Sequence, residues 1–321
     1  MHNGLTAFTS ALEQLADAEP QKDLADRADR ISRQYRDAQP SAGVITSHLD
    51  ALAYALVRAP ATYAAVAATL AQVSDRTPDF APRTTLDLGA GPGTASWAAS
   101  ALWPNTDFTL RDHNDAFLAL ARRLANADEG PGATADIGHA DIATTGDDKK
   151  FDLVMMAYAL TELSESAMQR AIEHAWAQTE GILLLVEPGR PREYARLMQA
   201  RDWLIEAGGV IVAPCPHAML CPLVGNDWCH FTERLPRTRR HRQLKRADMG
   251  YEDEKFSYLA IARPDINLTA PRARVIAPKT LKKYGVELPV CQPDGNRSAV
   301  EITKRDPAFK QARKRDWGDT I

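Results

Sequence analysis

The stretch LDLGAGPGTA, residues 86–95, decides the fold of this chain. It joins an apolar run typical of a buried strand to three glycines, Gly89, Gly91 and Gly93, and then to a helix-forming run. Glycine tolerates the tight turn that such a junction requires, and it leaves room for a ligand beside the backbone N–H groups. The pattern therefore predicts a strand, a ligand-binding turn and a helix in succession.

Strand-like and helix-like segments alternate after this loop. Further strands are predicted in DFTLRDHN, ATADIGHADI, FDLVMMAYALTEL and GILLLVEPG. This alternation predicts a parallel, doubly wound α/β sheet with a Rossmann-like core. Two more strands are predicted at 209–216 and 255–263, which makes the segment between them an insertion.

The flanking regions differ from this core. Residues 1–80 predict helices, and the helical pattern of 47–75 is broken by Pro60. We predict three parts: a helical N-terminal region, a Rossmann-like domain with a cysteine-rich insertion at 213–250, and a basic C-terminal extension with short strand-like runs. Their bounds are 1–80, 81–263 and 264–321.

Charge is distributed unevenly. The net charge is −3, yet residues 230–321 hold 21 Lys/Arg against 12 Asp/Glu, and residues 1–229 hold 18 against 30. This asymmetry predicts that the C-terminal third contacts a polyanion, with a solvated basic face as the alternative. No run of 18 apolar residues is free of charge, so we expect no membrane partner. The N-terminus resembles neither a signal nor a transit peptide, and we therefore predict a cytoplasmic location.

Three acids stand in register with the glycine loop. Asp87 precedes the first glycine by two residues, Asp112 ends the second predicted strand, and Asp141 follows the third. The G-x-G-x-G loop with its preceding acid resembles motif I of class I S-adenosylmethionine (SAM) methyltransferases. The resemblance implies that the loop and Asp87 hold the methionine part of SAM, that Asp112 binds the ribose hydroxyls, and that Asp141 meets the adenine amine. A helix cap is the alternative for Asp141, and a scaffold without turnover is the alternative for the whole motif.

The sequence does not name the atom that would be methylated. The segment YALTEL, 158–163, lacks the Asn/Asp-Pro-Pro-Tyr motif of amino-group methylation, and no core cysteine precedes Cys215 for cytosine-C5 chemistry. We expect Tyr158, Thr161 and Glu162 to face the methyl group, which makes them the catalytic candidates. Helix capping explains Thr161 and Glu162 equally well.

Three of the four cysteines stand close together. Five residues separate Cys215 from Cys221, seven separate Cys221 from Cys229, and 61 more precede Cys291. Structural zinc sites usually pair cysteines two to four residues apart, whereas an iron–sulfur cluster takes four thiolates from a looping chain. The spacing favours a [4Fe–4S] cluster, with zinc, unliganded thiols and, least, a disulfide as alternatives. His217 and His230 are possible ligands if Cys291 is remote.

The segment RLPRTRRHRQLKR, 234–246, is the predicted main RNA contact. It contains seven cations and no acid, and phosphates attract such a run. The alternative is a charged helix without a partner. The seven cations are Arg234, Arg237, Arg239, Arg240, Arg242, Lys245 and Arg246.

Several segments together resemble the methyltransferase-like assembly factors of the mitochondrial small ribosomal subunit and their bacterial relatives. These segments are LDLGAGPGTASWA, LLLVEPG, CPHAMLCPL, DWCHFTERLPRTRRHRQLKRADMGYEDEKFSYLAIAR and VCQPDG with ARKRDWGD. The resemblance implies a SAM-type Rossmann fold and a [4Fe–4S] cluster on Cys215, Cys221, Cys229 and Cys291. It also implies that the partner is small-subunit ribosomal RNA or a ribosome assembly intermediate. We expect a SAM-dependent methyltransferase acting on this RNA; the alternatives are a non-catalytic assembly factor and an iron- or redox-sensing RNA-binding protein.

Overall fold

The chain forms two compact units, each assembled from distant segments. The structure is a computed structural model, and it describes residues 2–36, 43–127, 130–132, 134–144, 148–223, 225 and 227–321. Unit 1 comprises Met1–Leu70, Ala81–Val186 and Glu233–Glu254, and unit 2 comprises Ala71–Phe80, Glu187–Thr232 and Lys255–Ile321. The contiguous domains drawn from the sequence do not coincide with these units and stay predictions.

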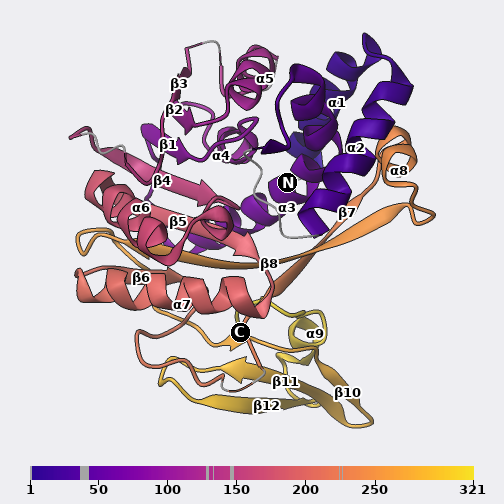
Figure 1. Ribbon diagram of the computed structural model, residues 1–321. Helices are drawn as coiled ribbons and strands as arrows, with labels where there is room; N and C mark the ends of the chain where they lie inside the picture. Colours follow the sequence, from indigo (N-terminus) through magenta and orange to yellow (C-terminus); the bar gives the residue numbers. More distant parts are fainter. Residues whose placement is uncertain are drawn as a thin grey trace. The chain divides into compact units, whose positions relative to one another are not determined.

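Unit 1 is built on a parallel sheet with strand order β3-β2-β1-β4-β5 (Figure 1). The strands are β1 (Thr84–Leu88), β2 (Asp107–Asp112), β3 (Asp136–His139), β4 (Phe151–Ala157) and β5 (Thr179–Pro188). β1 lies between β2 and β4, so the chain leaves β1 where the strand order reverses, and parallel sheets bind ligands at this point. The predicted Rossmann-like α/β fold of the methyltransferase type is therefore confirmed.

Helices join these strands and form the N-terminal region. They are α1 (His2–Asp17), α2 (Gln21–Arg36), α3 (His48–Arg76), α4 (Thr94–Leu102), α5 (Asp115–Ala125), the 3₁₀ turn η2 (Leu160–Glu162) and α6 (Glu165–Gln178). Local signals explain where several of them begin. Asn114 caps α5 by accepting hydrogen bonds from the N–H groups of Ala116 and Phe117, and Ser164 caps α6. The N-terminal helices predicted from the sequence are confirmed.

Helix α3 differs from the prediction at Pro60. The sequence predicted a break there, but the helix continues through the proline. Proline removes one hydrogen bond inside a helix, at a cost of roughly 3 kcal/mol; burial of apolar residues on both sides, such as Val57 and Tyr63, offsets that cost. Of the helices described, α3 is one whose length and composition would suit a membrane span, but most of its apolar window is buried in the molecule, as in a core helix.

The remaining strands lie largely in unit 2, although residues 233–254 belong to unit 1. The two strands predicted after the parallel core are present as β6 (Val210–Ala213) and β8 (Tyr251–Ala262), and they pair antiparallel. Helix α7 (Pro191–Glu206) precedes β6. The segment between β6 and β8, predicted as an insertion, also forms β7 (Phe231–Pro236), which pairs with β8, and the short helix α8 (Arg239–Lys245).

The last sixty residues fold as a small antiparallel sheet with its own core. It contains β9 (Arg274–Val275), β10 (Thr280–Lys282), β11 (Gly285–Cys291) and β12 (Arg297–Thr303), and the short helix α9 (Phe309–Ala312) packs beside it (Figure 1). Val275, Val286, Leu288 and Val290 are buried together. The C-terminal extension is thus a folded element, and it holds Cys291 in place at the end of a strand.

Candidate functional site

A cavity of about 550 Å³ lies in unit 1 beside the glycine loop. Its walls come from the carboxyl ends of β1, β2 and β4 and from α3. Of the residues predicted to bind SAM, five line this cavity and Gly93 is not among the lining residues. The five are Asp87, Gly89, Gly91, Asp112 and Asp141.

The three glycines all adopt left-handed backbone conformations, with φ of 69°, 53° and 82° for Gly89, Gly91 and Gly93. Such φ values are strained for residues with a side chain. A Cβ atom at Gly89 would lie 2.7 Å from that of Ala159, whereas a Cβ at Gly91 would meet no atom within 4 Å. Gly89 is therefore required by packing, and Gly91 faces open space in the cavity.

Two buried acids fix the loop. Asp112 accepts a hydrogen bond from the N–H of Gly91 at 2.7 Å and one from the N–H of Asn114 at 2.8 Å. One oxygen of Asp87 accepts from the hydroxyl and the N–H of Ser96, at 2.8 and 3.1 Å. The other oxygen of Asp87 is buried without a partner among the described atoms. Burial, assisted by the charge of Asp112, raises the pKa of Asp87 to about 6.

Asp141 also has a structural role. Its carboxylate accepts a hydrogen bond from the N–H of Ala143 at 2.9 Å, which stabilises a turn at 141–144 rather than a helix. Asp141 also lines the cavity.

The catalytic candidates lie after β4. Tyr158 and Glu162 line the cavity, while Thr161 is not among the lining residues. Tyr158 has a φ of 59°, which is uncommon for a residue with a bulky side chain. Its hydroxyl donates to the buried carboxylate of Glu254 at 2.8 Å. No sequence motif pointed to Glu254, nor to four residues that tertiary packing brings to the cavity wall: Tyr54, Thr62, His113 and His139.

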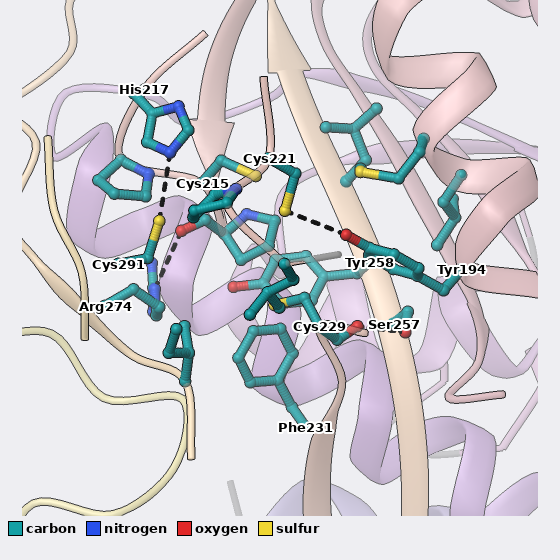
Figure 2. A pocket seen from close by; sticks show the side chains of 18 residues that line it. Tyr194, Cys215, His217, Cys221, Cys229, Phe231, Ser257, Tyr258, Arg274 and Cys291 are labelled. Carbon is teal, nitrogen blue, oxygen red and sulfur yellow. Dashed lines mark hydrogen bonds between the residues drawn. The ribbon is translucent and has the colours of Figure 1, made fainter. Parts of the chain in front are cut away.

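A second cavity, in unit 2, is lined by all four cysteines (Figure 2). Cys215 follows β6, Cys221 lies in the next loop, Cys229 precedes β7 and Cys291 ends β11. The other walls are mostly apolar and include Phe231, Pro214 and Leu259. The structure therefore brings together four thiols that are up to 76 residues apart in the sequence.

Hydrogen-bond donors approach two of these sulfurs. The hydroxyl of Tyr194, on α7, donates to the sulfur of Cys221 at 3.1 Å. Nε2 of His217 lies 3.2 Å from the sulfur of Cys291, as the dashed lines of Figure 2 show. Burial raises the pKa of Cys215 and Cys229, and it raises the pKa of Cys291 to about 12.

Two buried arginines complete this site. Arg201 donates to the carbonyl oxygens of His217 and Met219, at 3.2 and 2.7 Å, and so holds the loop between Cys215 and Cys221. Arg274 lines the cavity and donates to the carbonyl oxygens of Pro214 and Gly318 and to the side chain of Gln72. Within the part of the chain that the structure describes, every hydrogen-bond partner of Arg274 is neutral.

The cysteines surround a space rather than a point. All four are free thiols. No three His, Cys, Asp or Glu side chains in the described ranges lie close enough together to hold a single metal ion.

The candidate histidine ligands and Trp228 occupy different positions relative to the cysteines. Cys291 is not remote, so the condition for a histidine ligand does not arise. His230 is not among the residues that line the cysteine cavity; it packs between Trp228 and Trp317, with ring centroids 4.9 and 4.3 Å away. The indole N–H of Trp228 donates to the carbonyl oxygen of Gly189 at 3.1 Å.

The basic segment 234–246 is largely engaged within unit 1. Arg234 pairs with Asp253 at 2.6 Å, and Arg237 and Lys245 both pair with Glu252. Three further cations make these contacts: Arg240 pairs with Glu13 and Asp17, Arg246 with Asp29, and Arg242 donates to the carbonyl oxygen of Asp248. Arg239 is exposed. The role of the segment as the main RNA contact stays a prediction, but most of its charge is already compensated.

A family model and several curated proteins match this chain. The family model "Mitochondrial small ribosomal subunit Rsm22" matches residues 48–321. The human ribosome assembly protein METTL17, mitochondrial, is 27% identical over 287 residues, which cover 84% of this chain and 62% of that protein. The Rsm22-cox11 tandem protein 2, mitochondrial, of Schizosaccharomyces pombe is 24% identical over 286 residues, which cover 73% of this chain and 38% of that protein. The chain thus spans less than two thirds of either relative.

Among solved structures, the SAM-bound magnesium protoporphyrin IX methyltransferase of Synechocystis PCC 6803 is similar, with 16% identity and a TM-score of 0.42. The match covers 63% of this chain and 80% of that one. A likeness at this level carries no functional conclusion. The names of the relatives do correct one prediction: a cytoplasmic location is wrong for this family, because the family and these relatives are named as mitochondrial.

Proposed function

The chain belongs to the Rsm22 family, and on that premise we propose that it is a SAM-binding, methyltransferase-like factor that acts on the RNA of the small ribosomal subunit during assembly. Family membership supports the ribosomal role. The observation that carries SAM binding is the glycine loop, held by Asp112 at the edge of a cavity of about 550 Å³ and open beside Gly91.

The predicted SAM-binding and catalytic residues that line this cavity each have a role in the proposal. The N–H groups of the loop and Asp87 would hold the methionine part, Asp112 the ribose hydroxyls and Asp141 the adenine amine. SAM supplies an activated methyl group. Tyr158 and Glu162 would line the side from which a substrate atom approaches.

A binding measurement tests this proposal. Calorimetry on the full chain should give a SAM isotherm, and Gly91→Val should abolish it, because a branched side chain would occupy the open space beside the loop. Gly208→Val is a matched control: Gly208 also has a left-handed φ, 84°, and open space around it, but it lies in unit 2 outside the residues that line the cavity. The absence of SAM affinity in the wild-type protein would refute the proposal.

A second candidate function, an assembly factor without methyl transfer, is favoured by one contact. The hydroxyl of Tyr158 donates its proton in a hydrogen bond to Glu254, so that proton is not directed toward a substrate atom. Incubation with methyl-labelled SAM and small-subunit RNA or assembly intermediates separates the two functions. Label in the RNA that depends on Asp112 supports an enzyme, whereas SAM binding without label supports the assembly factor.

We further propose that the four cysteines hold a [4Fe–4S] cluster. The supporting observation is Arg274, which is 3% exposed and has only neutral hydrogen-bond partners among the described groups. A buried cation is costly unless an anion compensates it. Protonated thiols carry no charge, whereas thiolates on a cluster do. The donors on Tyr194 and His217 suit thiolate sulfurs for the same reason.

Metal analysis tests this second proposal. Anaerobically purified protein should contain about four iron and four sulfide per chain and absorb near roughly 400 nm. Cys291→Ser should lower the iron content and destabilise the C-terminal sheet, since Cys291 ends β11 and pairs with Arg274 and Arg297 across the ladder. Ser298→Ala on exposed β12 is the control. Stoichiometric zinc without iron or sulfide would contradict the cluster.

A further inference from the structure

Among the residues described, more cations without a carboxylate partner lie in the C-terminal region than in the predicted RNA segment. Six cations between 283 and 314 are exposed, and no ion pair is formed by any of them with the described residues. In the predicted RNA segment, by contrast, five of the seven cations pair with carboxylates. The six cations are Lys283, Lys304, Arg305, Lys310, Arg313 and Lys314.

Three of these cations converge at one end of the sheet. The N–H of Lys304 donates to the carbonyl oxygen of Tyr284 at 2.8 Å, and the register pairs Gly285 with Thr303. The turn between β10 and β11 therefore lies beside the exit of β12 (Figure 1). We call the residues at this end, Lys283, Tyr284, Lys304 and Arg305, the β-turn patch.

The acids near the β-turn patch have other partners. Asp306 accepts a hydrogen bond from the N–H of Ala308 at 2.8 Å, which caps the turn before α9. Glu301 is bonded to Lys282, which also pairs with Glu287 at 2.6 Å. None of these acids forms a side-chain ion pair with Lys283, Lys304 or Arg305 among the described residues.

Tyr284 gives the patch an aromatic surface. Tyr284 is 54% exposed. The ammonium of Lys282 lies 5.9 Å from the ring centroid, and the hydroxyl is 3.5 Å from Glu301, so the ring is oriented by its neighbours. An exposed ring held among cations is the combination that binds unpaired bases and their phosphates.

We propose that the β-turn patch binds a single-stranded segment of small-subunit RNA, an inference that rests on the proposed function. Phosphates would contact Lys283, Lys304 and Arg305, and a base would stack on Tyr284. A single-stranded segment fits better than a duplex, because the bases of a duplex are stacked on each other and are not available to a protein ring. An acidic protein would use the same charges but would not need the ring.

Anisotropy titrations on the full, cluster-loaded chain test this inference. The probes are an oligouridine of about 20 nucleotides and an RNA duplex of equal length, each titrated at several salt concentrations. The triple variant Lys283→Glu/Lys304→Glu/Arg305→Glu should weaken oligouridine binding at least tenfold. The slope of the logarithm of the binding constant against the logarithm of the salt concentration should become shallower by about two to three. Tyr284→Ala should weaken it about tenfold with the salt dependence unchanged. The matched control is Arg239→Glu/Arg242→Glu, two exposed charges on α8, and urea unfolding checks the folding of each variant.

Every outcome of these titrations either supports or overturns the inference. Weakened binding in the patch variants only, with oligouridine preferred over the duplex, supports the inference. Four results would overturn the inference and leave the proposed function intact. They are wild-type binding by the triple variant, a loss of binding in the α8 control alone, equal affinity for oligouridine and duplex, and wild-type binding by Tyr284→Ala. A wild-type chain that binds SAM but no RNA removes the RNA part of the proposed function as well.

Discussion

The carboxylate of Asp112 accepts a hydrogen bond from the N–H of Gly91 at 2.7 Å, so the last residue of β2 directly fixes the loop that follows β1. The register places Asp87 and Leu88 opposite Leu110 and Arg111, which brings the two strand ends level. The acid expected to meet the ribose therefore also holds the loop expected to meet the methionine part, and the two halves of the cavity are fixed relative to one another.

Replacing Asp112 should therefore have two effects. Asp112→Ala should weaken SAM binding by roughly 1–3 kcal/mol, the cost of a lost charged hydrogen bond, and should also lower the free energy of unfolding of the ligand-free protein. Calorimetry and urea unfolding measure the two effects. Asp107→Ala, at the exposed beginning of the same strand, is the matched control and should change neither. Unaltered stability in Asp112→Ala would show that the Gly91 contact does not hold the loop.

Asp87 should make stability depend on pH. Burial raises its folded-state pKa to about 6, above the ordinary value of 3.8, so the folded state favours the protonated acid. The contribution of Asp87 to stability therefore grows as pH falls through 6, and the cost of burying its charge is fully present above that value. Lowering the pH from 7 to 5 should stabilise the wild type relative to Asp87→Asn by about 1 kcal/mol in urea unfolding. A difference between the two proteins that does not change with pH would contradict this.

The sequence predicted those features that local patterns determine. The loop at Gly91 and the acid at Asp112 stand at fixed distances along a strand–turn–helix unit, so their proximity follows from the fold. The four cysteines were predicted to share a site from their number and rarity, and they do line one cavity. Tyr194 and Arg274 have no such signal, because they reach the cavity only through tertiary packing.

The predicted RNA segment shows why the rest could not be inferred. A run without acids looked uncompensated, but Arg240 pairs with Glu13 and Asp17, more than 220 residues away in the sequence. Ion pairs of this kind depend on which helices pack together, here α1 and α8, and no spacing rule encodes them. For the same reason the unpaired charge of Lys304 could not be distinguished from the paired charge of Arg240.

The hydrogen bond from Tyr194 to Cys221 should influence the redox chemistry of a bound cluster. A donor to a ligand sulfur stabilises the more negative, reduced state. Tyr194→Phe should therefore lower the reduction potential by roughly 40 mV, one net hydrogen bond for a one-electron couple, while iron and sulfide content stay the same. Tyr258→Phe is the control: Tyr258 is buried in the same cavity, and its hydroxyl donates to no sulfur among the described residues. Equal potentials in wild type and Tyr194→Phe, or equal shifts in both variants, would contradict this role.

Arg240 and Arg239 provide a matched pair on α8. Arg240 donates to the backbone carbonyl of Glu13 at 2.9 Å and pairs with the carboxylates of Glu13 and Asp17 on α1, and its side chain is only 17% exposed. Arg240→Ala should lower the free energy of unfolding by about 1 kcal/mol, since partly buried charged hydrogen bonds are lost and a carboxylate is left unpaired. Arg239→Ala should leave it unchanged, because Arg239 is exposed.

Urea unfolding of both variants at low and high salt measures the effect, and salt should reduce it only in part because the contact is partly shielded from solvent. Equal stability of the two variants would show that Arg240 does not join α8 to α1. A loss in Arg240→Ala would also mean that replacing Arg237, Arg239 and Arg240 together by Glu reports on folding as well as on RNA. The single change at Arg239 then tests whether α8 contacts RNA without disturbing the fold.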